Sequence, residues 1–231
     1  MSRVALLGYS GETGKMLVKN LMGKQSRFTN IQLIGRKELL PQIQAQYDTS
    51  KKSMSEKIID FEKMMSGENP FDELDQCFVA LGSSIEACNN DKSLFKRYSK
   101  DYITQLAKHA HEKGCRHFHV ITGAGSTKKH FHLYPITKAE LEEDLIALKL
   151  NKLSIYRPGI LLCDRVEHRG YEIPIRKIAG IISCFNNDAA CSTDNLAKAM
   201  IYNGIKSEST GHEWVSNRKC ISLAKKFDAE I

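Results

Sequence analysis

The chain has 231 residues, of which 42% are hydrophobic and 26% charged, and its formal net charge is +7. This length and composition are typical of one soluble globular domain with a real core, and they exclude disordered, fibrous and collagen-like chains. The basic residues form no single block and no nucleic-acid recognition motif is present, so nucleic acid is not an expected partner.

Short apolar stretches alternate with helical segments, and this alternation predicts a Rossmann-type α/β fold with a doubly wound parallel sheet. The expected strands are 4–7, 31–34, 57–59, 77–81, 117–122, 153–156 and 213–215. The expected helices are 13–22, 94–113 closed by Gly114, one that begins near Pro135, and a last one capped by Ser216. Residues 37–56 are expected to hold a loose helix or a mobile loop.

We expect a single domain over residues 1–231, in which about 160–231 form a smaller substrate-side part with a polar loop at 164–171 and short helices. No apolar run approaches the about 20 residues that a membrane-spanning helix needs. The first strand begins almost at once, which leaves no room for a targeting peptide. We therefore expect a cytoplasmic protein, with the nucleus and the mitochondrial surface as alternatives.

A glycine-rich turn lies between the first strand and the first helix, with the spacing Gly-x-x-Gly-x-x-Gly. The first glycine allows a tight turn, the second a close approach to a pyrophosphate, and the third close packing of the helix on the strand. The amides at the start of the helix then face the phosphates. The turn residues expected to contact a dinucleotide are Gly8, Ser10, Gly11, Glu12, Thr13 and Gly14.

The end of the second strand indicates which dinucleotide is bound. Sites specific for NAD place an acidic residue there, whereas this chain has Arg36 and Lys37. A cation at this position pairs with the 2′-phosphate of NADPH, which makes NADPH the expected cofactor. The alternative is an ordinary solvated strand end. Asp60, after the third strand, is expected at the adenine amino group, although aspartate also ends strands for turn reasons alone.

Tyr134 and Lys138 lie four residues apart at a predicted helix start, so their side chains share one face. A lysine beside a tyrosine favours the phenolate and lowers the pKa of the tyrosine. The tyrosine then exchanges a proton with a substrate oxygen while the nicotinamide moves a hydride. Thr122, at the end of the preceding strand, is expected to orient the substrate carbonyl. The alternative is an ordinary amphipathic helix start.

Several segments carry a resemblance to a known family: 7–14, 33–36, 60–63, 80–82, Tyr134 with Lys138, and 156–165. With these, the chain resembles the atypical branch of the short-chain dehydrogenase/reductase superfamily. It is similar in particular to the HIV Tat-interacting-protein oxidoreductases and their fungal mitochondrial-surface relatives. The likeness runs from the first strand to about residue 205.

The resemblance implies a Rossmann-like parallel sheet, NADPH binding and a Tyr/Lys pair at the nicotinamide. It further implies cofactor contacts from Phe61, Leu81, Gly82, Lys138 and Arg157. The family pattern has serines where this chain has Thr122, whose extra methyl group stiffens the side chain and narrows the pocket.

Two hypotheses follow. In the first, the protein is an NADPH-dependent reductase of a carbonyl compound. In the second, it is a non-catalytic regulator whose NADPH site acts as a redox sensor or brace for a protein partner. No metal site is expected, because the three His-x-His pairs, including His117 with His119, have no third ligand at a sensible spacing.

Overall fold

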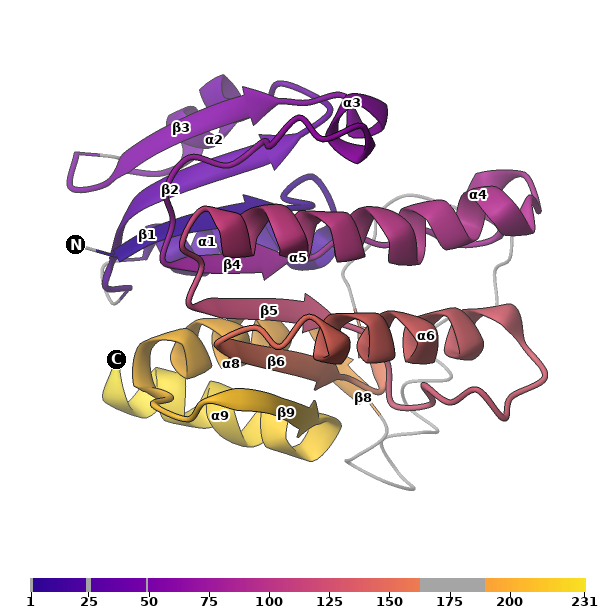
Figure 1. Cartoon of the computed structure of the whole chain (residues 1–231). Coiled ribbons are helices and arrows are strands. Elements are labelled where there is room, and N and C mark those ends of the chain that lie inside the picture. The colour runs from indigo at the N-terminus through magenta and orange to yellow at the C-terminus, as the bar shows by residue number, and fades with distance from the viewer. Residues whose placement is uncertain (1, 24–25, 49, 163–189) are drawn as a thin grey trace.

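The computed structural model describes residues 2–23, 26–48, 50–162 and 190–231. Its main sheet is parallel and seven-stranded, in the order β3-β2-β1-β4-β5-β6-β9, which confirms the predicted Rossmann-type fold (Figure 1). The strands are β1 (Ser2–Leu7), β2 (Phe28–Gly35), β3 (Ser53–Ile58), β4 (Gln76–Val79), β5 (His117–Ile121), β6 (Lys152–Arg157) and β9 (Gly211–Ser216). A second, small sheet pairs β7 (Ile160–Leu162) with β8 (Ala190–Ser192).

Helices cover both faces of the main sheet (Figure 1). They are α1 (Glu12–Met22), α2 (Leu40–Gln46), α3 (Phe61–Met65), α4 (Lys92–Lys96), α5 (Tyr102–Glu112), α6 (Leu133–Ala147), α8 (Thr193–Lys206) and α9 (Asn217–Glu230). The apolar side chains of α1, α8 and α9 pack on one face, and those of α3, α5 and α6 on the other. Within the described ranges, no helix is long and apolar enough to cross a membrane.

Strand β1 shows why the sheet lies at the centre of the fold. Val4 and Leu6 point to the face covered by α1 and α8, while Ala5 and Leu7 point to the face covered by α5. All four are almost completely buried. A strand buried on both faces is continuously apolar rather than alternating, which is why this segment was recognisable in the sequence.

The helix predicted over 94–113 is present but is not regular. It begins at α4, where the side chain of Asp91 accepts hydrogen bonds from the amides of Ser93 and Leu94. A π-helical segment at Arg97–Asp101 then leads into α5. Gly114 follows with a φ of +88°, which confirms the predicted left-handed position. The predicted cap Ser216 is also confirmed, since its side chain accepts from the amide of Lys219.

Two element predictions were wrong. The third strand is Ser53–Ile58 rather than 57–59, because β3 lies at the sheet edge and half of its residues face solvent, so polar side chains are tolerated there. The helices expected to be short before the last strand include α8, which has 14 residues. The polar loop expected at 164–171 and the end of the resemblance segment 156–165 lie outside the described residues.

Candidate functional site

The glycine-rich turn joins β1 to α1, and two of its glycines are required by the packing of the chain itself. Gly8 has a φ of +81°, and a Cβ there would lie 2.5 Å from the carbonyl oxygen of Ala80. A Cβ on Gly14 would lie 1.9 Å from the carbonyl oxygen of Gly8. Any side chain at either position therefore displaces backbone, which makes both glycines structural.

Gly11 is different, because the fold does not demand a glycine there. Its φ is −82°, and the nearest atom to an added Cβ is the Gly8 carbonyl oxygen at 3.4 Å, an ordinary contact. Gly11 also precedes α1 without a side-chain cap. The turn therefore offers an open backbone surface beside the first amides of an eleven-residue helix, a geometry suited to an anion.

The end of β2 is fixed by Tyr9, a turn residue that the sequence analysis did not single out. Its ring is 3% exposed and lies where a Cβ on Gly35 would be, 2.7 Å away. Its hydroxyl donates to the carbonyl oxygen of Lys37 at 2.8 Å. Burial is the main cause that raises the pKa of Tyr9. The backbone that carries Arg36 is thereby held against the glycine turn.

A cavity of about 690 Å³ opens at the carboxyl ends of the strands, beside Arg36. Five of the predicted cofactor residues line it: Arg36, Asp60, Phe61, Leu81 and Gly82. Within the described ranges, the exposed guanidinium of Arg36 has no ion-pair partner. Asp60 has two roles in this structure, since its carboxylate also caps α3 by accepting from the amide of Glu62 at 2.8 Å.

Two tyrosines that line this cavity were missed in the sequence analysis. Tyr98 and Tyr102 line it, and their ring centroids lie 5.4 Å apart. Tyr102 also stacks on Phe61, at 4.9 Å between centroids. The available signal was two aromatic residues four apart on the helix that follows β4, a spacing that places both rings on one face.

The predicted catalytic residues come together at the start of α6. The hydroxyl of Tyr134 points to the carbonyl oxygen of Thr122 at 3.4 Å, a long contact, and the Tyr134 side chain is half exposed. The ammonium of Lys138 lies 5.8 Å from the centroid of the Tyr134 ring. Lys138 itself is buried, with only 2% of its surface exposed.

The electrostatics of this pair differ from the expectation for the tyrosine. Burial raises the pKa of Tyr134, whereas the sequence analysis expected Lys138 to lower it. Burial also lowers the pKa of Lys138 to about 8, with the nearby carboxylate of Glu142 acting in the opposite direction. In this arrangement desolvation sets the direction of the Tyr134 pKa shift, with the lysine ammonium 5.8 Å from the ring centroid.

Glu142, which the sequence analysis missed, joins three elements at this site. Its carboxylate is buried and accepts from the Thr122 hydroxyl at 2.7 Å and from the indole nitrogen of Trp214 at 3.2 Å. It also forms an ion pair with Arg157, whose Nε donates at 3.0 Å. The signal in the sequence was a glutamate one turn after Lys138 on the same helix face.

Hydrogen bonds to Glu142 fix the orientation of the side chains of Thr122 and Arg157, two residues that the sequence analysis placed in the site. The single hydroxyl proton of Thr122 is held by this carboxylate, so the threonine does not offer it to the site. The guanidinium of Arg157 lies against Glu142 and over Trp214, 5.4 Å from the indole, and is not among the residues that line the cavity at Arg36. The structure does not bring Arg157 together with the other predicted cofactor residues.

We predict that Glu142→Gln lowers the free energy of unfolding by about 2 kcal/mol, because it removes the partner of a partly buried guanidinium. The neighbouring Glu143 provides a matched control, since it forms an exposed ion pair with Lys128. Glu143→Gln should change stability by less than about 1 kcal/mol. Urea unfolding of both variants measures the difference, and equal losses would contradict the assigned role of Glu142.

No protein-family model matches the chain. The rat protein HTATIP2 is 34% identical over 226 residues, which cover 97% of this chain and 90% of that protein. The mitochondrial protein fmp52 of Aspergillus niger is 26% identical over 211 residues, which cover 89% of this chain and 88% of the relative.

Solved structures show the same fold at low sequence identity. MoeE5, in complex with UDP-glucuronic acid and NAD, has a TM-score of 0.66 at 12% identity, covering 99% of this chain and 83% of that one. The dTDP-glucose 4,6-dehydratase DesIV of Streptomyces venezuelae, with NAD and TYD bound, has a TM-score of 0.66 at 14% identity and covers 97% of this chain and 80% of its own. At these identities the likeness establishes the fold alone.

Proposed function

Because the chain belongs to the HTATIP2 family, we propose that it is an NADPH-binding protein of the short-chain dehydrogenase/reductase type that reduces a carbonyl compound. The observation that carries the proposal is Gly11. The fold leaves space for a side chain at this position, and the chain nevertheless has glycine between two glycines that packing requires. A ligand that approaches the backbone closely accounts for it.

The cavity beside the turn fits the adenosine half of such a cofactor. Leu81 and Phe61 supply apolar surface for an adenine ring, and Asp60 supplies a carboxylate at the rim. The turn residues Ser10, Glu12 and Thr13 stand at the start of α1, where the helix amides attract phosphate. The residues present therefore fit a dinucleotide.

The preference for NADPH over NADH is assigned to Arg36. Its guanidinium lines the cavity and, within the described part of the chain, lacks a carboxylate partner, so it is free to pair with a 2′-phosphate. Lys37 follows it on the exposed backbone that Tyr9 holds in place. Neither position carries the acidic side chain that would favour unphosphorylated ribose.

The catalytic part of the proposal rests on α6. The bound cofactor would supply a hydride to the substrate carbonyl. Tyr134 would then give its hydroxyl proton to the carbonyl oxygen, and the buried charge of Lys138 would stabilise the phenolate that remains. Since Glu142 holds its proton, Thr122 would help to position the substrate by accepting a hydrogen bond from a donor group other than the carbonyl. Arg157 would act through Glu142, with a cofactor contact as the further role that the family resemblance suggests.

We predict that Arg36→Ala weakens NADPH binding by about 10- to 100-fold and leaves NADH binding unchanged, because one charge-assisted contact is lost. Arg27→Ala, which removes an exposed arginine just before β2, should change neither affinity. Fluorescence titration of both variants with each dinucleotide measures the effect. An equal loss of affinity for NADPH and NADH would contradict the role assigned to Arg36.

A second candidate function is a non-catalytic NADPH-binding regulator that acts through a protein partner. Two observations favour it: the Thr122 proton is already committed to Glu142, and the loop before α6 presents Phe131 with 99% of its surface exposed. A screen of carbonyl compounds separates the two functions. Oxidation of NADPH with any of them supports the reductase, and binding without turnover supports the regulator.

For the cellular location we propose the cytoplasm, with the mitochondrial surface as the alternative that the names of the fungal relatives support. Fractionation of cells that express a tagged chain separates these two. Recovery of the chain with washed mitochondria would contradict the cytoplasmic assignment.

A further inference from the structure

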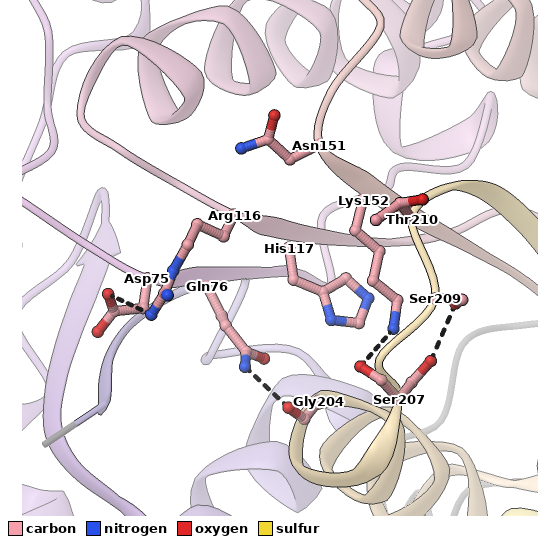
Figure 2. Close-up of a pocket in the computed structure, with 10 residues that line it drawn as sticks. All are labelled: Asp75, Gln76, Arg116, His117, Asn151, Lys152, Gly204, Ser207, Ser209 and Thr210. Atoms are coloured by element: carbon pink, nitrogen blue, oxygen red, sulfur yellow. Dashed lines mark hydrogen bonds and ion pairs between the residues drawn. The ribbon is translucent and has the colours of Figure 1, made fainter.

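A second cavity, of about 540 Å³, lies where strands begin, at the opposite end of the sheet from the glycine turn, which follows the end of β1. Figure 2 shows the residues that line it. It is formed where β4, β5, β6 and β9 begin, whereas the dinucleotide site lies where strands end. Its lining includes Gln76, His117 and Lys152 from the strand starts and Ser207 and Thr210 from the segment between α8 and β9. The two sites therefore share no residue.

Lys152 brings a buried cation to this cavity. The residue is 6% exposed, and its ammonium donates one hydrogen bond, to the carbonyl oxygen of Ser207 at 2.8 Å. An ammonium has three protons to donate. Among the described residues no carboxylate lies within ion-pair distance of it, and burial lowers the pKa of Lys152. Two N–H groups of the buried Lys152 ammonium are thus available to donate hydrogen bonds to a ligand.

His117 supplies an acceptor beside this cation. The residue is 5% exposed, and its Nε2 lies 2.7 Å from the hydroxyl oxygen of Ser154. That hydroxyl has a single proton, which it donates to Glu213 at 2.7 Å, so Nε2 must be the donor to Ser154. The other ring nitrogen, Nδ1, then carries a lone pair, and it has no hydrogen-bond partner among the described residues.

The protonation state of the ring agrees with this assignment. Burial, followed by the charge of Lys152, lowers the pKa of His117 to about 3. The ring is therefore neutral near pH 7 and accepts a hydrogen bond through Nδ1. In Figure 2 the ring of His117 and the ammonium of Lys152 point toward the same space above Gly204 and Ser207.

Charged side chains of both signs surround the opening, with Lys152 as the buried cation. Arg116 is well exposed at the rim and pairs with Asp75 at 3.1 Å. Asp75 is shared with Arg3, whose amide donates to it at 2.8 Å. Glu213 lies behind Ser154 and is engaged by Asn203 at 2.8 Å. The cavity lining itself thus holds two cations and one paired carboxylate, and the carboxylate of Glu213 outside the lining partly offsets the burial that lowers the pKa of Lys152.

We propose that this cavity binds a small phosphate, either inorganic phosphate or the phosphate group of a small monoester. Lys152 donates to the phosphate oxygens, Arg116 attracts the anion from the rim, Thr210 lies at the edge, and Nδ1 of His117 accepts from a hydroxyl of the ligand. Phosphate suits the site because a singly protonated phosphate offers both acceptors and a donor. The site is separate from the dinucleotide cavity and does not depend on the function proposed for it.

The test is an NMR titration of the full chain, labelled with ¹⁵N-histidine, with inorganic phosphate. We expect a saturable shift of the His117 ring nitrogens. Lys152→Met should weaken binding about tenfold or more, because a charge-assisted hydrogen bond is lost. Lys225→Met, on the exposed face of α9, and Arg36→Ala, in the dinucleotide cavity, should bind phosphate as the unmodified chain does.

A further variant and a second ligand complete the test of the phosphate site. Arg116→Ala, at an exposed position, should also weaken phosphate binding, and it tests the site even if Lys152→Met fails to fold. Tighter binding of glycerol 3-phosphate than of inorganic phosphate identifies a monoester as the ligand class, and the reverse identifies the free ion. The proposal is overturned if no saturable shift occurs, if acetate binds as tightly as phosphate, or if Arg36→Ala abolishes the shift.

Discussion

Replacing Gly14 with alanine should lower the free energy of unfolding by at least about 3 kcal/mol. The added Cβ would lie 1.9 Å from the carbonyl oxygen of Gly8, so α1 must move away from β1 to accept it. Alanine is otherwise the better helix former, by about 1 kcal/mol, and a loss of stability would therefore report the steric conflict. Urea unfolding followed by circular dichroism measures it.

Gly11→Ala is the matched control in the same turn. Its Cβ would meet only the Gly8 carbonyl oxygen at 3.4 Å, so its stability should change by less than about 1 kcal/mol. Its affinity for NADPH should nevertheless fall, because the methyl group occupies the space assigned to the pyrophosphate. If Gly14→Ala were as stable as Gly11→Ala, the packing account of this turn would be wrong.

Tyr134→Phe should reduce the turnover of a carbonyl substrate by at least about 100-fold and leave NADPH affinity unchanged. The substitution removes only the hydroxyl that would donate the proton, and its contact with Thr122 is long enough to contribute little stability. Initial rates of NADPH oxidation with a responsive carbonyl compound measure the effect. This prediction rests on the reductase proposal.

Tyr98→Phe is the control. It removes a hydroxyl from a residue that lines the dinucleotide cavity and has no assigned role in catalysis, so it should retain turnover. The pH profile provides an independent measurement. Since burial lowers the pKa of Lys138 to about 8, the lysine is charged below that pH and neutral above it. Turnover should therefore fall as the pH rises through about 8, and a profile that rises across this range would contradict the role of Lys138.

The fold was predictable from sequence where burial is complete. Strand β1 is buried on both faces and its apolar run stands out, whereas β5 and β6 are also buried but carry polar side chains between the apolar ones. Strand β3 was misplaced because an edge strand with exposed side chains has no such run. The length of α8 was underestimated although Leu196 and Met200 follow a helical spacing on its buried face.

The candidate site was predictable where its residues are close in sequence to strand ends. Arg36, Asp60 and Gly82 each follow a strand of a parallel sheet, so topology alone brings them to one edge. Glu142 was not predictable in this way, because its role depends on which side chains of β6 and β9 meet α6. The position of the Arg157 guanidinium is set by its ion pair with Glu142, and it could not be deduced from the place of Arg157 in the segment 156–165.

The central claim is that the glycine turn and the cavity beside it bind NADPH. Calorimetric titration of the unmodified chain with NADPH, and in parallel with NADH, tests it most directly. We predict one NADPH bound per chain, with NADH at least about tenfold weaker because it lacks the phosphate that pairs with Arg36. Tighter binding of NADH would contradict the assignment of Arg36, and no heat with either dinucleotide would contradict the cofactor site itself.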